Sequence, residues 1–273
     1  MNFRIDIIDV MSKSVFLRQF GMTLRHSLRP HTSMMKESNV DLAQKEPDAD
    51  LLQKATVCPL VLLDYVDDTL KERDHFGFKK MITVDDLFNA RVHYGHKVGT
   101  VNEKMKWSLF GERLGVCIFD LQKTRECLIT ALNFVAHIAM RGGMFLFITA
   151  EKNNMLMVER KALEINEFAH IRCWKEDTLL NTKALFGAPV RLPDTIIFLS
   201  TLTSVLEKHP AIREAAKMVI PTVGIVDSNA DPTYITYPIP GNDDSVSSVQ
   251  YFMDCFVKAI KMGKEARQSL LAD

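Results

Sequence analysis

The sequence of 273 residues lacks the glycine-rich turns with which many α/β proteins bind a nucleotide or a cofactor phosphate. No apolar run is followed by G-x-G-x-x-G or by G-x-x-x-x-G-K-[ST]. The pair Gly142-Gly143 precedes an apolar run, which is the wrong side of a strand for a nucleotide. These absences argue against a nucleotide-dependent enzyme, and we predict neither a cofactor nor a catalytic activity.

Paired cysteines and long apolar runs are also missing. The five cysteines are scattered and no two of them form C-x-x-C. They therefore predict free thiols in a reducing compartment, and not a disulfide framework or a zinc cluster. No apolar run approaches the roughly 20 residues that a helix needs to cross a bilayer. We therefore expect a soluble protein that does not enter a membrane.

The formal net charge is zero, but the charges are segregated along the chain. Residues 11–36 hold five Lys and Arg and no acid, whereas residues 41–76 hold nine acids and four Lys and Arg. An amphipathic N-terminus that is rich in Arg and Ser and free of acids is typical of a mitochondrial transit peptide. We predict such a peptide over residues 1–36, with Met11 as an alternative start. A disordered basic tail is the other interpretation.

Residues 37–80 form an acidic stretch with little periodicity. This composition predicts an N-terminal extension that wraps a partner or stays mobile, because it cannot build a core of its own. The regular patterns begin after it. We therefore predict one globular domain over residues 81–273.

Short apolar runs alternate with helical patterns from residue 82 onward. The runs predict strands over 116–121, 144–149, 170–174, 196–200, 223–226 and 235–239. The segments between them predict helices over 84–90, 124–141, 153–168, 211–218 and 245–268. Strands that alternate with helices are typical of a parallel sheet. We predict a three-layer α/β fold, Rossmann- or flavodoxin-like, with a mostly parallel sheet and helices on both faces.

Cations and aromatic rings are concentrated in residues 91–125. Within residues 91–113, here called the basic segment, five Lys or Arg stand against two acids, with His, Tyr and Trp interleaved. Such a surface suits phosphates and stacked bases. Lys123 and Thr124 follow a predicted strand, where the start of a helix favours an anion. The predicted RNA-contact residues are Arg91, His93, Tyr94, His96, Lys97, Asn102, Lys104, Lys106, Trp107, Arg113, Lys123 and Thr124.

These residues also have simpler interpretations. Any single cation can belong to a solvated loop, and Thr124 can be a plain helix N-cap. His93 and His96 can hydrogen-bond backbone or phosphate and so order the turn. Their three-residue spacing, without a Cys or acid partner nearby, is a weak metal signal, and we predict no metal site.

Two further groups of charged residues remain open. Asp227, Asn229 and Asp231 follow a predicted strand and resemble a magnesium or phosphoryl-transfer site, but such residues beside a proline favour an ordinary turn. The last predicted helix carries four cations at three-residue spacing: Lys258, Lys261, Lys264 and Arg267. We expect them to be either solvated or laid against RNA.

Several motifs resemble, in order, those of the universal small-subunit ribosomal protein 2 family. They are H-Y-G-H at 93–96, N-E-K-M at 102–105, F-G-E-R-L-G at 110–115 and D-L-Q-K-T at 120–124. A second block has P-D at 193–194, E-A at 214–215, I-P-T at 220–222, V-D-S-N-A-D-P at 226–232 and Y-P-I-P-G-N-D-D-S at 237–245. Motifs in this number and order argue against chance similarity.

The chain departs from the bacterial members of that family at one place. In those members a long helical hairpin lies between an R-W-x-G-G stretch and the P-D strand. Here the Gly-Gly is absent, and too few residues separate Trp174 from Pro193 to hold a hairpin. A shortened core that follows a predicted transit peptide is similar to the mitochondrial form of the family.

The resemblance implies a structural protein of the mitochondrial small ribosomal subunit, located in the matrix. It would bind rRNA and neighbouring ribosomal proteins where head and body meet, near the mRNA exit. The acidic extension would meet protein and not RNA. Two alternatives remain: a ribosome-derived adaptor that binds little rRNA, and a nucleotide- or phosphosugar-binding α/β enzyme.

Overall fold

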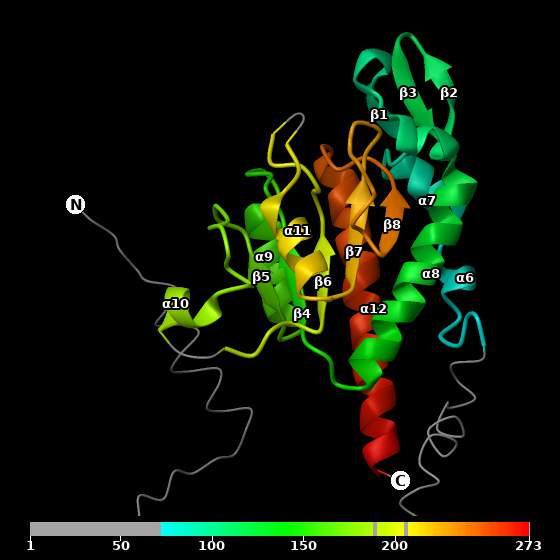
Figure 1. Cartoon of the computed structure of the whole chain (residues 1–273). Coiled ribbons are helices and arrows are strands. Elements are labelled where there is room, and N and C mark those ends of the chain that lie inside the picture. The colour runs from blue at the N-terminus through cyan, green and yellow to red at the C-terminus, as the bar shows by residue number, and fades with distance from the viewer. Residues whose placement is uncertain (1–71, 188–189, 205–206, 273) are drawn as a thin grey trace, which may run out of the picture. The chain divides into compact units, whose positions relative to one another are not determined.

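The computed structural model describes residues 72–187, 190–204 and 207–272. All of them lie in one compact unit, Asp67–Asp273 (Figure 1). The predicted transit peptide (1–36) and most of the predicted extension (37–80) lie outside the described residues, so both stay predictions. Within the described part, every helix is too short or too polar to cross a membrane.

Five parallel strands form the main sheet in the order β5-β4-β6-β7-β8. They are β4 (Phe145–Ile148), β5 (Phe168–His170), β6 (Thr195–Phe198), β7 (Thr222–Val226) and β8 (Tyr237–Pro240). The inner strands β6 and β7 are buried along their whole length, as expected when both faces of a sheet are covered. The predicted α/β fold with a mostly parallel sheet is confirmed.

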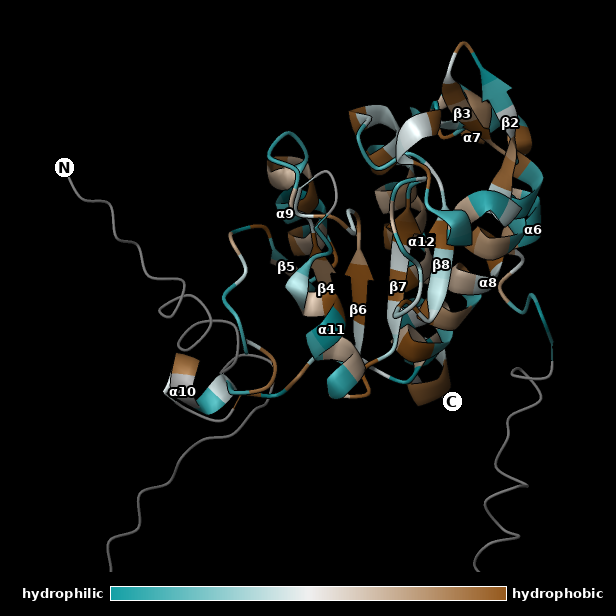
Figure 2. Cartoon of the chain, turned by 45° about the horizontal axis from the view of Figure 1, so that its top comes forward, coloured by the Kyte–Doolittle hydropathy of each residue, from teal (hydrophilic) through white to brown (hydrophobic). Residues whose placement is uncertain are grey.

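Two hydrophobic clusters lie on the two faces of this sheet. One face packs through Phe145, Phe147 and Ile197 against α8 (Leu121–Met140), α9 (Met155–Glu164) and α12 (Val246–Ala272). The other face packs through Ile148 and Ile196 against α11 (Pro210–Lys217) and nearby loops. Successive side chains of a strand point to opposite faces, so apolar strands supply both clusters (Figure 2).

The strand predicted over 116–121 does not join the parallel sheet. It is β3 (Val116–Phe119), which lies antiparallel between β1 (Tyr94–Lys97) and β2 (Leu109–Arg113) in a separate three-stranded sheet. Leu114 and Gly115 have φ angles of 54° and 76° and form a two-residue turn between paired Arg113 and Val116. Two successive left-handed residues suit a tight hairpin, which pairs β3 before the chain reaches α8.

Other differences from prediction concern the ends of elements and a short helix that was not predicted. β5 ends at His170, where the predicted strand began. Helix α8 begins three residues before its predicted start, because the Asp120 side chain, and not that of Thr124, caps it by accepting from the Gln122 amide at 3.1 Å. Between Trp174 and Pro193 the described residues hold the short helix α10 (Thr182–Phe186) in place of a long hairpin.

The residues just before the predicted domain also pack against it. They include the short helix α6 (Phe78–Met81), which is followed by α7 (Val84–Asn89). Asn133 Nδ2 donates to Asp74 Oδ1 at 3.1 Å, and Arg125 donates to the backbone oxygens of Lys79 and Ile82 at 2.6 and 2.7 Å. Residues 74–82 therefore contact α8 both near its start, at Arg125, and in its middle, at Asn133.

Candidate nucleic-acid interface

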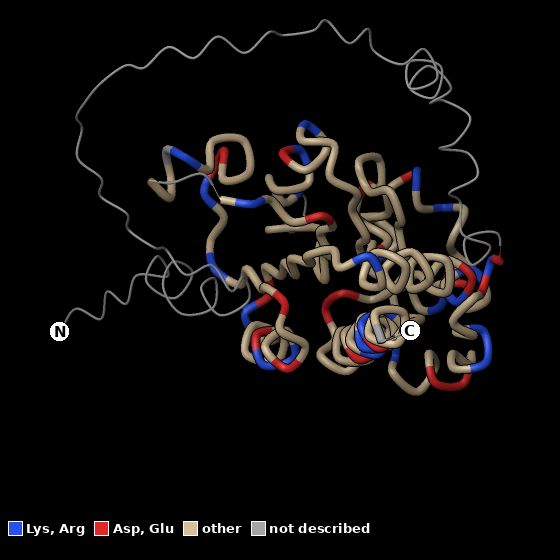
Figure 3. The backbone as a smooth tube through the Cα atoms, turned by 90° about the horizontal axis from the view of Figure 1, so that it is seen from below, with Lys and Arg blue, Asp and Glu red and all other residues tan. Residues whose placement is uncertain are grey.

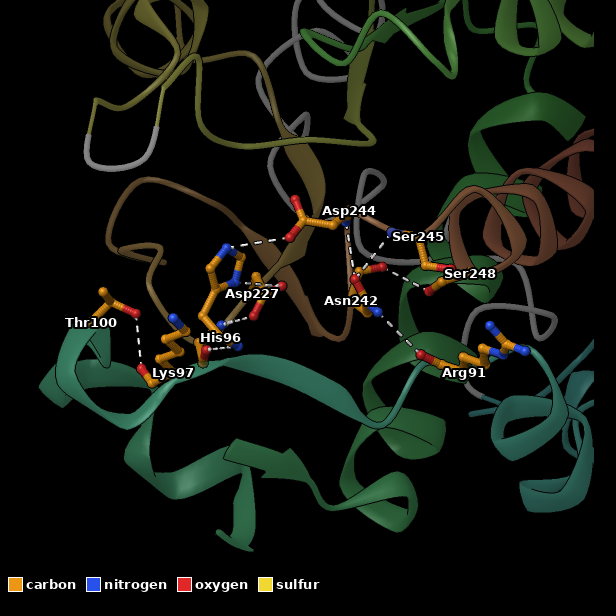
Figure 4. Close-up of polar contacts among 10 residues, drawn as sticks. Arg91, His96, Lys97, Thr100, Asp227, Asn242, Asp244, Ser245 and Ser248 are labelled. Carbon is orange, nitrogen blue, oxygen red and sulfur yellow. Dashed lines mark hydrogen bonds and ion pairs between the residues drawn. The ribbon is translucent and has the colours of Figure 1, made fainter. Parts of the chain in front are cut away.

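The basic segment is an ordered structure and not an irregular loop. It contains β1, the 3₁₀ helices η1 (Val98–Thr100) and η2 (Glu103–Ser108), and β2. The turn after β7 holds it in place: the His96 amide donates to Ser228 Oγ at 2.9 Å, and the Asn102 amide donates to the Ser228 carbonyl at 2.8 Å. The turn after β8 adds Asn242, whose Nδ2 donates to the Arg91 carbonyl at 3.3 Å (Figure 4).

His96 lies between two carboxylates from these turns. Its Nδ1 is 3.1 Å from Asp227 Oδ2, and its Nε2 is 3.3 Å from Asp244 Oδ2 (Figure 4). The hydrogen bond to Asp227 and the charges of the neighbouring carboxylates outweigh burial and raise the pKa of His96 to about 9. The His96 side chain therefore bridges the turns after β7 and β8 through the carboxylates of Asp227 and Asp244.

The glycine of H-Y-G-H permits this close approach. A Cβ atom added to Gly95 would lie 3.1 Å from Ser228 Oγ and 3.3 Å from the Cys117 carbonyl oxygen. Both contacts are tighter than a side chain normally accepts, so glycine lets the turn after β7 reach β1.

The same cluster has the composition of a small metal site. One nitrogen of His96 and one oxygen each of Asp227 and Asp244 lie within 4.8 Å of one another. An imidazole and two carboxylates can ligate a divalent cation. Asp243, next in the chain, is buried, and burial and the Asp227 charge raise its pKa well above the usual range. The absence of a metal stays a prediction.

Four of the predicted RNA-contact residues serve the fold through internal hydrogen bonds. Lys104 Nζ lies 3.2 Å from Asp231 Oδ2, and Lys123 Nζ donates to the Trp107 carbonyl at 2.6 Å. Asn102 Oδ1 accepts from the Lys104 amide at 3.0 Å. Thr124 is fully buried, with its hydroxyl donating to the Asp120 carbonyl at 3.2 Å. A buried Thr124 cannot receive an external anion in this structure.

The predicted aromatic contacts are also divided between interior and surface. His93 is 9% exposed and stacks on Phe88 with ring centroids 4.5 Å apart, while its centroid lies 4.1 Å from that of the half-exposed Tyr94. Phe88, His93, Phe110 and Phe119 line a pocket of about 360 Å³. His93 therefore supports an aromatic surface and does not itself present a free face.

A set of exposed cations and apolar side chains remains on this structure. Arg91, Lys97 and Arg113 are exposed and have no ion-pair partner within the described ranges. Lys106 and Glu103 pair at 3.4 Å in solvent, where such a pair contributes little. The exposed apolar side chains are Tyr94, Val98, Trp107, Phe110 and Leu114. Phe110 and Leu114 were missed, because without the hairpin turn nothing marks them as outward-facing.

The two groups left open by the sequence are now placed. Asp231 Oδ1 accepts from the Thr233 amide at 3.0 Å, so the turn interpretation of that stretch agrees with the structure. On α12, Lys261 pairs with Glu164, and Lys264 donates to the Ile165 carbonyl at 2.6 Å. Lys261 and Lys264 therefore contact the last residue of α9 and the residue after it, whereas Lys258 and Arg267 are exposed on α12, which also carries Asp254 and Glu265 (Figure 3).

Comparison with known proteins gives close relatives. The small ribosomal subunit protein uS2m of Bos taurus is 46% identical over 230 residues, which cover 84% of this chain and 76% of the relative. The small ribosomal subunit protein uS2 of Campylobacter concisus is 33% identical and covers 67% of this chain and 85% of the relative. The protein of the same name in Rickettsia bellii (strain OSU 85-389) is 28% identical over 67% of this chain and 77% of its own length.

The family model for ribosomal protein S2 matches residues 87–194 and 187–263. The match therefore includes the basic segment, the main sheet and most of α12. Its two parts meet at residues 187–194, next to the place where the bacterial hairpin is predicted to be absent. The prediction of the family in its mitochondrial form is confirmed. The chain belongs to the ribosomal protein S2 family, whose members are structural proteins and not enzymes.

Proposed function

We propose that this protein is a structural component of the mitochondrial small ribosomal subunit, and that it binds rRNA through the exposed part of the basic segment. Its membership of the ribosomal protein S2 family and its similarity to bovine uS2m support the ribosomal and mitochondrial assignments. The Arg- and Ser-rich residues 1–36 support import into the matrix as a transit peptide. Neighbouring ribosomal proteins are further partners, and the acidic residues 37–80 suit such contacts.

The observation that carries the rRNA proposal is a set of unpaired cations on a rigid support. Lys97 and Arg113 are exposed on the two edge strands of the small antiparallel sheet, β1 and β2, and Arg91 is exposed just before β1. These three cations have no ion-pair partner in the described part of the chain, and the same segment exposes the rings of Tyr94 and Trp107. Cations contact phosphates without reading sequence, and flat rings can stack on unpaired bases. Hydrogen bonds to Ser228 and Asn242 hold this surface on the main sheet, so little ordering entropy is lost on binding.

Reversal of two of these charges tests the proposal. We expect Lys97→Glu with Arg113→Glu to weaken binding to small-subunit rRNA at least about tenfold, because each substitution removes a cation that neutralises a phosphate and adds repulsion. In a salt titration, the plot of log affinity against log salt should become shallower by about one for each phosphate that is no longer neutralised. Sedimentation of the variant in mitochondrial extracts should show less protein in the small subunit.

The control is Lys152→Glu with Lys217→Glu, which makes the same change of net charge at exposed positions away from the basic segment. It should keep both the affinity and the salt slope. Equal losses of affinity in both double variants would mean that total charge, and not this surface, determines binding.

A further inference from the structure

One acid on the turn after β7 is bonded to the basic segment. Asp231 is 16% exposed, and its Oδ2 lies 3.2 Å from Lys104 Nζ in η2. It also pairs with Lys208, which precedes α11, and accepts from the Thr233 amide at 3.0 Å. Burial alone would raise the pKa of Asp231, but the hydrogen bonds from Lys208, Thr233 and Lys104 hold it below the usual range. Asp231 is therefore an ionised link between three segments.

These bonds determine where η2 lies. The Asn102 amide at its start is bound to the Ser228 carbonyl, and Met105 on its inner side is fully buried in the cluster that contains Ala230. Lys104 Nζ also donates to Thr233 Oγ1 at 2.6 Å. The turn after β7 thus contacts the backbone at the start of η2, the buried side chain of Met105 and the charged side chain of Lys104.

The residues that η2 presents to solvent include two of the predicted RNA contacts. Lys106 and Trp107 are exposed and lie two and three positions after Lys104. A 3₁₀ helix has about three residues per turn, so Lys104, Lys106 and Trp107 lie within one turn. A change in the position of Lys104 therefore moves Lys106 and Trp107 as well. Lys104 and Lys208 together offset the charge of Asp231, so the acid does not leave a net negative site beside RNA.

We propose that Asp231 is a positioning residue for rRNA recognition: by holding Lys104 it orients η2 so that Lys106 and Trp107 face the RNA. This inference rests on the proposed function. It assigns Lys104 to an anchor, and not to a phosphate contact of its own.

A substitution that removes the charge distinguishes positioning from simple electrostatics. Loss of an acid near a polyanion should strengthen binding if only total charge matters. If Asp231 positions η2, Asp231→Asn should instead weaken binding to small-subunit rRNA about tenfold, which is the size expected when one charge-assisted hydrogen bond is broken. The salt slope should fall by no more than about one, because Lys106 is the cation that η2 turns towards the RNA.

The matched control is Glu112→Gln, which removes one negative charge from an exposed position in β2. It should bind as well as the natural protein or better. Hydrogen exchange supplies a second measurement: in Asp231→Asn, amides of η2 should exchange faster while those of β6 and β7 keep their protection. Faster exchange everywhere would mean general destabilisation and would count against positioning.

The outcomes separate the two proposals. If the natural protein does not bind small-subunit rRNA, the proposed function fails and this inference fails with it. If it binds but Asp231→Asn behaves like Glu112→Gln, the inference is wrong and the function stands. Should Asp231→Asn not fold, Lys104→Met cuts the same bond from the other side. Weaker binding together with faster hydrogen exchange of the η2 amides would support the anchor. Weaker binding with unchanged exchange of η2 would show that Lys104 contacts a phosphate itself and would overturn the inference.

Discussion

At the residue scale, ion pairs within the protein decide which cations of the basic segment are available to RNA. Lys104 is bound to Asp231, whereas Lys97 and Arg113 face solvent without an ion-pair partner in the described part of the chain. The partners come from distant positions: 132 residues separate His96 from Ser228, and 127 separate Lys104 from Asp231. No local pattern could show these pairs, which is why residue types alone could not tell which polar groups are paired within the protein.

The His96 contacts predict a pH-dependent contribution to stability. Its pKa is raised from 6.5 to about 9 in the folded protein, first by the hydrogen bond to Asp227. This contribution is complete below pH 6.5 and is lost as the pH rises towards 9, so the free energy of unfolding should fall by up to about 3 kcal/mol. Urea denaturation at several pH values between 6.5 and 9 measures this change.

The matched variant is His96→Gln, which keeps a polar side chain but cannot become charged. It should be less stable than the natural protein at pH 6.5 and nearly equal to it above pH 9. A constant difference across this range would show that the positive charge of His96 does not stabilise the fold.

At the scale of elements, close contact between α8 and α12 supports the main sheet. A Cβ atom added to Gly263 of α12 would lie 2.4 Å from the Ala136 carbonyl oxygen and 2.7 Å from Ala139 Cβ on α8. The two helices therefore touch through backbone at this point. Periodicity predicted both helices, but it could not show that this glycine lies at their crossing.

We expect Gly263→Ala to destabilise the protein. Alanine favours a helix over glycine by about 1 kcal/mol, but overpacking against backbone costs about 1–3 kcal/mol, so the net loss of stability should be about 1 kcal/mol. Chemical denaturation measures it. Gly99→Ala is the control, since a Cβ atom there meets nothing within 4 Å. Unchanged stability of Gly263→Ala would mean that the two helices separate at little cost.

At the scale of the whole described unit, burial keeps several histidines neutral. Desolvation lowers the pKa of His209 to about 4 and also lowers the pKa of His93, His137 and His170. These groups stabilise the fold fully above pH 6.5, and that stabilisation is lost as the pH falls below it. His96 acts in the opposite sense, because its contribution to stability is lost as the pH rises. Stability should therefore fall on both sides of neutral pH.

We therefore predict maximal stability between about pH 6.5 and 7, with a decline on both sides. On the acid side, His209→Gln should reduce the pH dependence between 6.5 and 4 by up to about 3 kcal/mol, because glutamine cannot take up a proton. Thermal melting of both proteins across this range tests the prediction. Parallel pH profiles would exclude His209 as the cause.

Local sequence determined the order and the type of most elements. Apolar runs of strand length and helical spacing are local properties, so they predicted β4, β6, β7 and the long helices α8 and α12 within a few residues. The ordered motifs predicted the family before any geometry was known. Periodicity and motifs both depend on residues that are close together in the chain, which is why they can be recognised in the sequence alone.

Tertiary structure decided how β3 pairs and which charged residues stay free. β3 looks like a sheet-core strand, but the left-handed turn at Leu114 and Gly115 pairs it with β2. Likewise Lys104 looks like an RNA contact until Asp231 reaches it from the end of β7. In both cases the deciding partner is fixed by packing and backbone geometry, and these depend on contacts between segments that the linear pattern does not contain.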